Sequence, residues 1–164
     1  SQFSSDQTIK STFTLYDGKI IEGVLIPATD RMTACVSSQV GCSLTCKFCA
    51  TGYMERKRNL NADEIYDQVV LIDKQAKDNY NTPLTNIVYM GMGEPLLNYA
   101  NVLKSVERIT APDGLNMAAK RIPVSTAGIA KMIKQLGDAG VRFNLALSLH
   151  AANEEKRTTI MPIN

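Results

Sequence analysis

The stretch Ala34-Cys-Val-Ser-Ser-Gln-Val-Gly-Cys-Ser-Leu-Thr-Cys-Lys-Phe-Cys49 joins a short apolar run to a cluster of cysteines. The chain has 164 residues, and its four cysteines all lie between positions 35 and 49. Disulfides between such near neighbours would close only tiny loops, which restrict little entropy of the unfolded chain. We therefore expect four reduced thiols rather than a disulfide scaffold.

Three of these cysteines, Cys42, Cys46 and Cys49, are separated by three and then two residues, so one tight loop can wrap a single cofactor. Three thiolates on a four-iron cluster leave one iron without a protein ligand, which suits a reaction centre. Zinc is the main alternative, but it favours four protein ligands, and His150 is the only histidine. Four inert buried thiols are a weaker alternative, because the loop is polar and flanked by glycine.

Upstream of the cysteine loop, two runs with high β-propensity, 12–15 and 20–26, flank the segment Tyr16-Asp-Gly-Lys19. An Asp-Gly pair between such runs is typical of a β-hairpin. The sequence therefore predicts an N-terminal hairpin and lead-in over residues 1–30. Residues 34–40 are predicted to form the strand that enters the cysteine loop.

Downstream of the loop, amphipathic helices alternate with short apolar strands. Asn61 can cap a helix over about 62–78 with Glu64 reaching back, and helical stripes recur over 102–109 and 129–136. Strands are predicted over 87–90, 121–124 and 143–149. This alternation indicates right-handed βαβ units with strands buried on both faces. We predict an α/β fold in which residues 31–164 form a partial TIM-type (βα) barrel of about four βα units, because a closed barrel needs eight.

Composition and charge limit the class of protein. The chain is 45% hydrophobic and 21% charged. This apolar content is enough for one sizeable core and excludes an intrinsically disordered protein. It lacks the long apolar run of a transmembrane helix and the apolar region of a signal peptide, so we expect a soluble cytoplasmic protein without a membrane partner. A net charge of +2 does not predict nucleic-acid binding. Arg56-Lys-Arg58 and Lys120-Arg121 can contact phosphates or simply face solvent.

Several ordered motifs resemble those of radical S-adenosylmethionine (SAM) enzymes, and more closely those of adenine-C2 RNA methyltransferases. The similarity extends from about Glu22 to the last residue. Its motifs are Cys35-Val-Ser-Ser-Gln-Val-Gly-Cys42, Met90-Gly-Met-Gly-Glu-Pro-Leu-Leu-Asn98, Ser125-Thr-Ala-Gly128, Leu147-Ser-Leu-His-Ala151 and Met161-Pro-Ile-Asn164. The resemblance implies a dual-specificity enzyme that methylates C2 of adenine in 23S rRNA and tRNA.

The resemblance also implies two cofactors. Cys42, Cys46 and Cys49 would ligate a [4Fe-4S] cluster whose open iron chelates SAM, and the reduced cluster would cleave SAM to a 5′-deoxyadenosyl radical. The SAM contacts that carry over are Gly93, Glu94, Ser125, Ser148, Leu149 and His150. All follow predicted strands at their C-terminal ends, where barrel sites lie. Without the resemblance, Gly93 and Glu94 would be interpreted as part of an ordinary turn, Ser125 as a helix cap and His150 as a core histidine.

Two further residues match catalytic positions of the family, whose reaction passes through a methylated cysteine near its C-terminus. Cys35 matches the cysteine that attacks the methylated sulfur and forms a disulfide as the product leaves. Glu22 matches the proton acceptor, although it is equally an ordinary strand glutamate. No cysteine follows Cys49, so we expect the methyl-carrying cysteine outside this chain and a fragment that is inactive alone.

The resemblance further implies a flavodoxin-like external electron donor and a monomeric full-length protein. Two alternatives stay open. One is a radical SAM enzyme with another substrate, including adenine C8, in which Cys35 is incidental. The other is a non-catalytic module that holds zinc or a structural cluster in the same loop.

Overall fold

The computed structural model describes residues 1–163, so Asn164, which ends the last motif, lies outside the described residues. The strands are β1 (Gln2–Phe3), β2 (Ile9–Thr14), β3 (Ile20–Ala28), β4 (Arg31–Cys35), β5 (Gln39–Val40), β6 (Arg58–Asn59), β7 (Asn86–Val88), β8 (Val124–Thr126) and β9 (Leu145–Leu147). The α-helices are α1 (Ala62–Tyr80), α2 (Tyr99–Thr110), α3 (Ala130–Asp138) and α4 (Glu154–Ile160). Short 3₁₀ helices are formed by Ala50–Tyr53, Pro95–Asn98 and Ala119–Arg121.

The predicted hairpin is present as the antiparallel pair β2 and β3. Its turn is closed by a hydrogen bond of 2.8 Å from Leu15 N to Lys19 O, and Gly18 has the positive φ of +77° that such a turn needs. β3 then pairs antiparallel with β4, with Val24 opposite Cys35. The hairpin therefore continues directly into the sheet of the strand–helix units, and a domain boundary near residue 30 stays a prediction.

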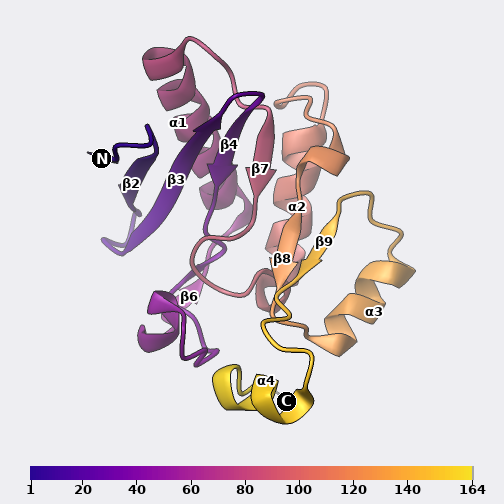
Figure 1. The fold of residues 1–164 in the computed structure, drawn as a ribbon. Helices are drawn as coiled ribbons and strands as arrows, with labels where there is room; N and C mark the ends of the chain where they lie inside the picture. The colour runs from indigo at the N-terminus through magenta and orange to yellow at the C-terminus, as the bar shows by residue number, and fades with distance from the viewer. Residues whose placement is uncertain (164) are drawn as a thin grey trace.

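Four strands, β4, β7, β8 and β9, are each followed by a helix, from α1 to α4. β4 pairs in parallel with β7, and β8 pairs in parallel with β9. A single parallel bridge between Tyr89 and Val124 joins the two pairs. Figure 1 shows α1 and α2 behind the strands, whose C-terminal ends point to the edge where α4 lies. The predicted α/β partial barrel is confirmed.

The first helix forms as its sequence predicts. Asn61 Oδ1 accepts a hydrogen bond of 2.8 Å from Glu64 N, and the Glu64 carboxylate accepts one of 3.0 Å from Asn61 N. This reciprocal capping box satisfies two N–H groups that the helix itself leaves unpaired. The face of α1 that carries Ile65, Val69 and Ile72 is fully buried and covers the sheet.

Three strand predictions are corrected. The strand expected over 34–40 is divided, because β4 ends at Cys35 and β5 contains only Gln39–Val40. The strand expected over 121–124 begins only at Val124, because Pro123 has no N–H to donate and residues 119–121 form a 3₁₀ helix. β9 is shorter than the expected 143–149 and is not buried on both faces, since Leu145 and Leu147 are 39% and 53% exposed. Within the described residues β9 pairs only with β8, so its other edge has no neighbouring strand.

Helix α4 was not predicted, although Asn153 followed by Glu154 and Glu155 is a helix-start pattern; Asn153 Oδ1 accepts from Lys156 N at 3.0 Å. In the part of the chain that the structure describes, no helix has the length and apolar character required to cross a membrane.

Candidate active site

A cavity of about 300 Å³ lies at the C-terminal ends of the parallel strands, which is where (βα) barrels carry their sites. Its walls come from the cysteine loop, the turn after β7, and the ends of β8 and β9. The predicted site residues that line it are Cys42, Cys46, Cys49, Gly93, Glu94, Ser125, Ser148 and His150. The fold therefore brings together residues that are more than one hundred positions apart in the sequence.

The cysteine loop is closed at its base by a two-residue ribbon. β5 and β6 pair antiparallel, with Gln39 opposite Asn59 and Val40 opposite Arg58. Inside the loop, Cys49 N donates to Cys46 O at 3.1 Å, so the chain turns tightly between the last two cysteines. A Cβ on Gly52 would lie 2.7 Å from Cys46 O, which explains the glycine that follows the motif.

The far side of the loop rests on the C-terminal helix. Lys47 N donates a hydrogen bond of 3.0 Å to Ile160 O at the end of α4. Cys46 packs in a small buried cluster with Ala127 and Met161. The loop is thus held both at its base and at its tip.

The donor set of the loop fits an iron–sulfur cluster. All four cysteines are free thiols, as expected, and burial raises the pKa of Cys42 and Cys46. A bound metal would reverse that effect, because coordination deprotonates a thiol. Among the described residues, no three His, Cys, Asp or Glu side chains converge closely enough to surround a single metal ion. A four-iron cluster does not need such convergence, since each cysteine ligates a different iron.

Glu94 joins two walls of the cavity. Its side chain is buried, with Oε1 accepting from Leu96 N at 3.0 Å and Oε2 accepting from Ala127 N at 2.7 Å. Burial raises the pKa of the Glu94 carboxyl group. Because a carboxylate can accept about four hydrogen bonds, the two donors leave it able to accept from a ligand amine.

The remaining wall is formed by the ends of β8 and β9. Ser125 Oγ and Ser148 Oγ are 3.3 Å apart, and His150 has a left-handed φ of +56°. The His150 ring lies 4.1 Å from the ring of Phe48, centroid to centroid, so this strand end touches the cysteine loop.

Arg157 of α4, which sequence reasoning missed, holds this wall in place. Its Nε donates to Leu149 O at 3.1 Å, and its Nη2 donates to Ser148 O at 3.3 Å and to Ala127 O. One guanidinium therefore links the backbone after β8 with the backbone after β9. The signal that could have found it is an arginine one helical turn after the Asn153 cap.

Three predicted residues do not line the cavity: Leu149, Cys35 and Glu22. The Leu149 side chain is 52% exposed and lies in a separate surface hollow beside Gly128. Its carbonyl accepts the hydrogen bond from Arg157 Nε.

Cys35 and Glu22 share the sheet face opposite α1. Cys35 is paired with Val24 across β3 and β4, and Glu22 is two residues from Val24, so the three side chains point to one side. Burial raises the pKa of the Cys35 thiol, and the backbone of Met90, a cavity-lining residue, partly offsets this effect. Glu22 forms an ion pair of 2.8 Å with Lys10 and is partly exposed.

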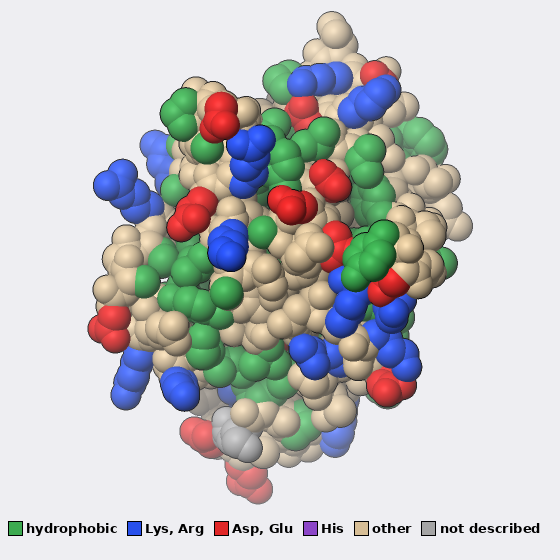
Figure 2. Space-filling view, turned by 180° about the vertical axis from the view of Figure 1, so that it is seen from behind, with side chains coloured by type: hydrophobic (Ala, Val, Ile, Leu, Met, Phe, Trp, Pro, Cys, Tyr) green, Lys and Arg blue, Asp and Glu red, His purple; other side chains and the backbone are tan. Residues whose placement is uncertain are grey.

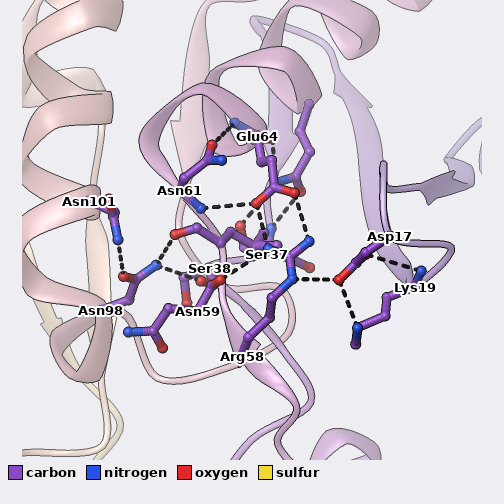
Figure 3. Close-up of polar contacts among 12 residues, drawn as sticks. Asp17, Lys19, Ser37, Ser38, Arg58, Asn59, Asn61, Glu64, Asn98 and Asn101 are labelled. Carbon is purple, nitrogen blue, oxygen red and sulfur yellow. Dashed lines mark hydrogen bonds and ion pairs between the residues drawn. The ribbon is translucent and has the colours of Figure 1, made fainter.

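Arg58, which the sequence offered as a phosphate contact, instead forms ion pairs within the protein. Its two Nη atoms donate to the Glu64 carboxylate at 2.7 and 2.8 Å, and its Nε donates to Asp17 at 2.8 Å (Figure 3). It therefore ties the hairpin turn to the start of α1. The same view shows Asn98, which donates to Ser38 O at 2.8 Å and to Leu60 O at 2.7 Å.

Comparisons with known proteins identify relatives of this chain. A probable dual-specificity RNA methyltransferase RlmN from Cytophaga hutchinsonii is 71% identical over 99% of this chain and 45% of its own length. The corresponding protein from Chlorobaculum tepidum is 45% identical over 99% of this chain and 44% of its own length. A radical SAM methyltransferase from Sphaerobacter thermophilus has a crystal structure that matches 98% of this chain and 47% of that chain, with a TM-score of 0.94 and 44% identity.

The chain thus spans a little under half the length of the relatives it matches. The family model of the radical SAM superfamily matches residues 36–164, from the segment before the cysteine loop to the last residue. On this evidence the chain belongs to the radical SAM superfamily of enzymes, and membership implies a [4Fe-4S] cluster and SAM as its cofactors.

Proposed function

We propose that this chain is the core of a radical SAM methyltransferase that methylates C2 of adenine in 23S rRNA and tRNA through a methylated cysteine outside the chain. The observation that carries the proposal is the cavity in which Cys42, Cys46 and Cys49 face Glu94 and the ends of β8 and β9. The names of the relatives support the substrate class.

In this proposal the chain binds and orients the cofactors. Cys42, Cys46 and Cys49 hold the cluster, which together with SAM supplies a 5′-deoxyadenosyl radical when both are bound. Glu94 accepts from the ammonium group of SAM, for which its buried carboxylate retains acceptor capacity. Gly93, Ser125, Ser148, His150 and the backbone of Leu149 complete the SAM contacts.

Cys35 and Glu22 are proposed to act on the substrate side. In the covalent adduct one methylene group joins the sulfur of the methylated cysteine to C2 of the adenine. The Cys35 thiolate attacks that sulfur, so an S–S bond forms as the S–CH2 bond breaks. The methylene carbon keeps the electron pair of the broken bond and takes up a proton, and the base departs with a methyl group. Glu22 accepts a proton from the adenine. Their common sheet face supports the pairing, and Cys35 lies opposite Val88 at the end of β7, two residues before the cavity-lining Met90.

The partners and location are proposed from the resemblance rather than from charge. We propose a cytoplasmic, monomeric full-length protein that takes electrons from a flavodoxin-like donor and has no membrane partner. Figure 2 shows acidic and basic side chains interspersed over most of the face seen from behind. This distribution agrees with the small net charge and does not itself mark an RNA surface.

The test uses the full-length protein, purified and reconstituted without oxygen. We expect iron and sulfide in a four-to-four ratio, reductant-dependent conversion of SAM to 5′-deoxyadenosine, and 2-methyladenosine in 23S rRNA and tRNA by mass spectrometry. Cys35→Ala should abolish release of methylated RNA while the cluster is retained. Zinc without iron would support a metal-binding module, 8-methyladenosine would support the alternative position, and unchanged turnover of Cys35→Ala would point to a different radical SAM reaction.

A further inference from the structure

The segment that joins β4 to the cysteine loop is buried. It is hydrogen-bonded to the turn after β7, which carries Glu94. Gly91 N donates to Val36 O at 3.0 Å, and Ser38 N donates to Met92 O at 2.9 Å. Met92 N donates to Ser37 Oγ at 2.9 Å. The entrance to the cysteine loop and the turn after β7 are therefore packed together as one layer.

Gln39 ends this segment and is fully buried, and its side-chain amide is bonded at both of its ends. Oε1 accepts from Glu94 N at 2.9 Å, while Nε2 donates to Asn59 Oδ1 at 2.7 Å. Asn59 lies on β6, where the cysteine loop returns to the sheet, and its Nδ2 donates to Leu97 O at 3.2 Å. One side chain thus connects the backbone of Glu94 with the closing strand of the cysteine loop.

Gln39 packs so closely against position 93 that only glycine fits there. A Cβ on Gly93 would lie 2.5 Å from Gln39 Cβ and 2.6 Å from Gln39 Cγ, and Gly93 has a φ of +95°. A side chain is therefore excluded at position 93 by Gln39 as well as by the backbone conformation. Gln39 itself does not line the cavity.

We propose that Gln39 is a positioning residue that fixes the Glu94 carboxylate relative to the three cysteines, and that it controls SAM affinity without touching SAM or the cluster. The inference rests on the proposed cofactor site. Because the amide of Gln39 holds Glu94 on one side and Asn59 on the other, its loss frees the turn to shift against the loop. The three thiols keep their own loop, which the backbone pairing of β5 and β6 closes independently.

The test compares variants of the full-length reconstituted protein. Gln39→Met keeps the length of the side chain and removes the amide. Gln75→Met is the matched control, because Gln75 Nε2 also donates a partly buried hydrogen bond, to Ser11 Oγ at 2.7 Å, at a distant point on α1. The measurements are iron and sulfide per chain, the SAM dissociation constant by equilibrium dialysis, and the change that SAM causes in the electron paramagnetic resonance signal of the reduced cluster.

We expect Gln39→Met to retain its iron and sulfide, to bind SAM at least about tenfold more weakly, and to need more SAM for the full spectral change. The control should bind SAM within about twofold of the wild type. Should Gln39→Met fail to fold, Asn59→Ala is expected to weaken SAM binding about threefold. This variant removes the anchor for Gln39 Nε2 together with the Asn59 bonds to Arg56 and to Leu97 O. Where both variants fold, their effects should be less than additive, because they break one chain of bonds.

The possible failures are distinguishable. Wild-type SAM binding together with an unchanged dissociation constant in Gln39→Met, or in Asn59→Ala, would overturn this inference and leave the proposed function intact. A loss of iron that parallels the loss of SAM binding would also overturn it, because Gln39 would then support the cluster loop alone. A wild-type protein that binds neither cluster nor SAM would overturn both proposals.

Discussion

The two sides of the cavity are held in different ways. On the side of β4 and β7, buried side chains such as Ser37, Gln39 and Asn98 bind the turns at many points. On the side of β8 and β9, α3 buries only Leu136, and one partly exposed arginine, Arg157, binds the strand ends. Regions with few buried contacts open locally at lower free energy. The comparison indicates a preorganised side at β4 and β7 and a side at β8 and β9 that depends on few contacts.

The strongest way to break this arrangement is Glu94→Gln, because Glu94 is bonded to both sides. An amide presents one NH₂ group where the carboxylate accepts from Leu96 N and Ala127 N, so a buried donor loses its partner. We expect the free energy of unfolding to fall by about 2 kcal/mol. SAM binding should weaken by more than about tenfold. Urea unfolding and equilibrium dialysis measure the two effects.

Glu107→Gln on the exposed face of α2 is the control for that change and should leave both quantities unaltered. Equal behaviour of the two variants would show that Glu94 does not join the two sides.

Arg157→Met tests the second side alone. Three backbone carbonyls lose a charged donor, so we expect a loss of about 1 to 2 kcal/mol in stability. Amide hydrogen exchange should accelerate at residues 148–151 and stay unchanged at residues 91–94. Lys156→Met, the neighbouring exposed position on α4, should change neither segment. Faster exchange in both segments would contradict the independence of the two sides.

Tyr89→Phe tests the packing behind the first side. The Tyr89 hydroxyl and Ser105 Oγ are 2.7 Å apart and buried, and Ser105 keeps Val102 O as its acceptor when the hydroxyl is removed. Loss of this single neutral hydrogen bond should lower the free energy of unfolding by about 1 kcal/mol. Thermal unfolding measures it, with Tyr16→Phe, an exposed ring, as the control. A larger loss for Tyr16→Phe would refute the assignment.

The smallest expected effect concerns Arg58 and depends on pH. Hydrogen bonds from Arg58 lower the pKa of Glu64 below its ordinary value of 4.5. A carboxyl group with a lowered folded-state pKa stabilises the fold above its unfolded pKa, and this contribution is lost as the pH falls through the folded value. Arg58→Met should therefore cost about 1 kcal/mol or less at pH 7.

The stability difference between Arg58→Met and the wild type should shrink as the pH falls below about 4.5. Lys74→Met removes an exposed ion pair with Asp78 and should show no comparable pH dependence. A constant difference for Arg58→Met from pH 7 to pH 3 would mean that the ion pair between Arg58 and Glu64 does not contribute to stability.

Local signals in the sequence were sufficient for the first half of the fold. The Asp17-Gly18 turn and the Asn61–Glu64 capping box are decided by residues within a few positions of one another, and both form as predicted. β8 and β9 were less predictable. Pro123 delays the start of β8. The leucines of β9 suggest a buried strand, although among the described residues no strand pairs with its second edge.

Site residues that belong to sequence motifs could be predicted. Residues whose role depends on tertiary contacts could not. The cysteine spacing and the Gly93-Glu94 turn gave residues that line one cavity. Gln39 and Asn59 act through contacts with segments distant in sequence, so no local pattern marks them. Arg157 follows the Asn153 cap by one helical turn, but that pattern does not reveal which carbonyls it binds. Arg58 shows the opposite error, because a basic run suggested a phosphate contact and the structure places two carboxylates beside it.

The ribbon formed by β5 and β6 has a consequence for how the cluster is acquired. Bringing the ends of a flexible loop together costs about (3/2)RT ln n for n residues, and here backbone pairing meets that cost during folding. Once one thiolate binds iron, the other two are already confined to the same small volume, at a high effective concentration. Closure of the loop by β5 and β6 therefore lowers the ordering cost that a cluster would have to offset on binding.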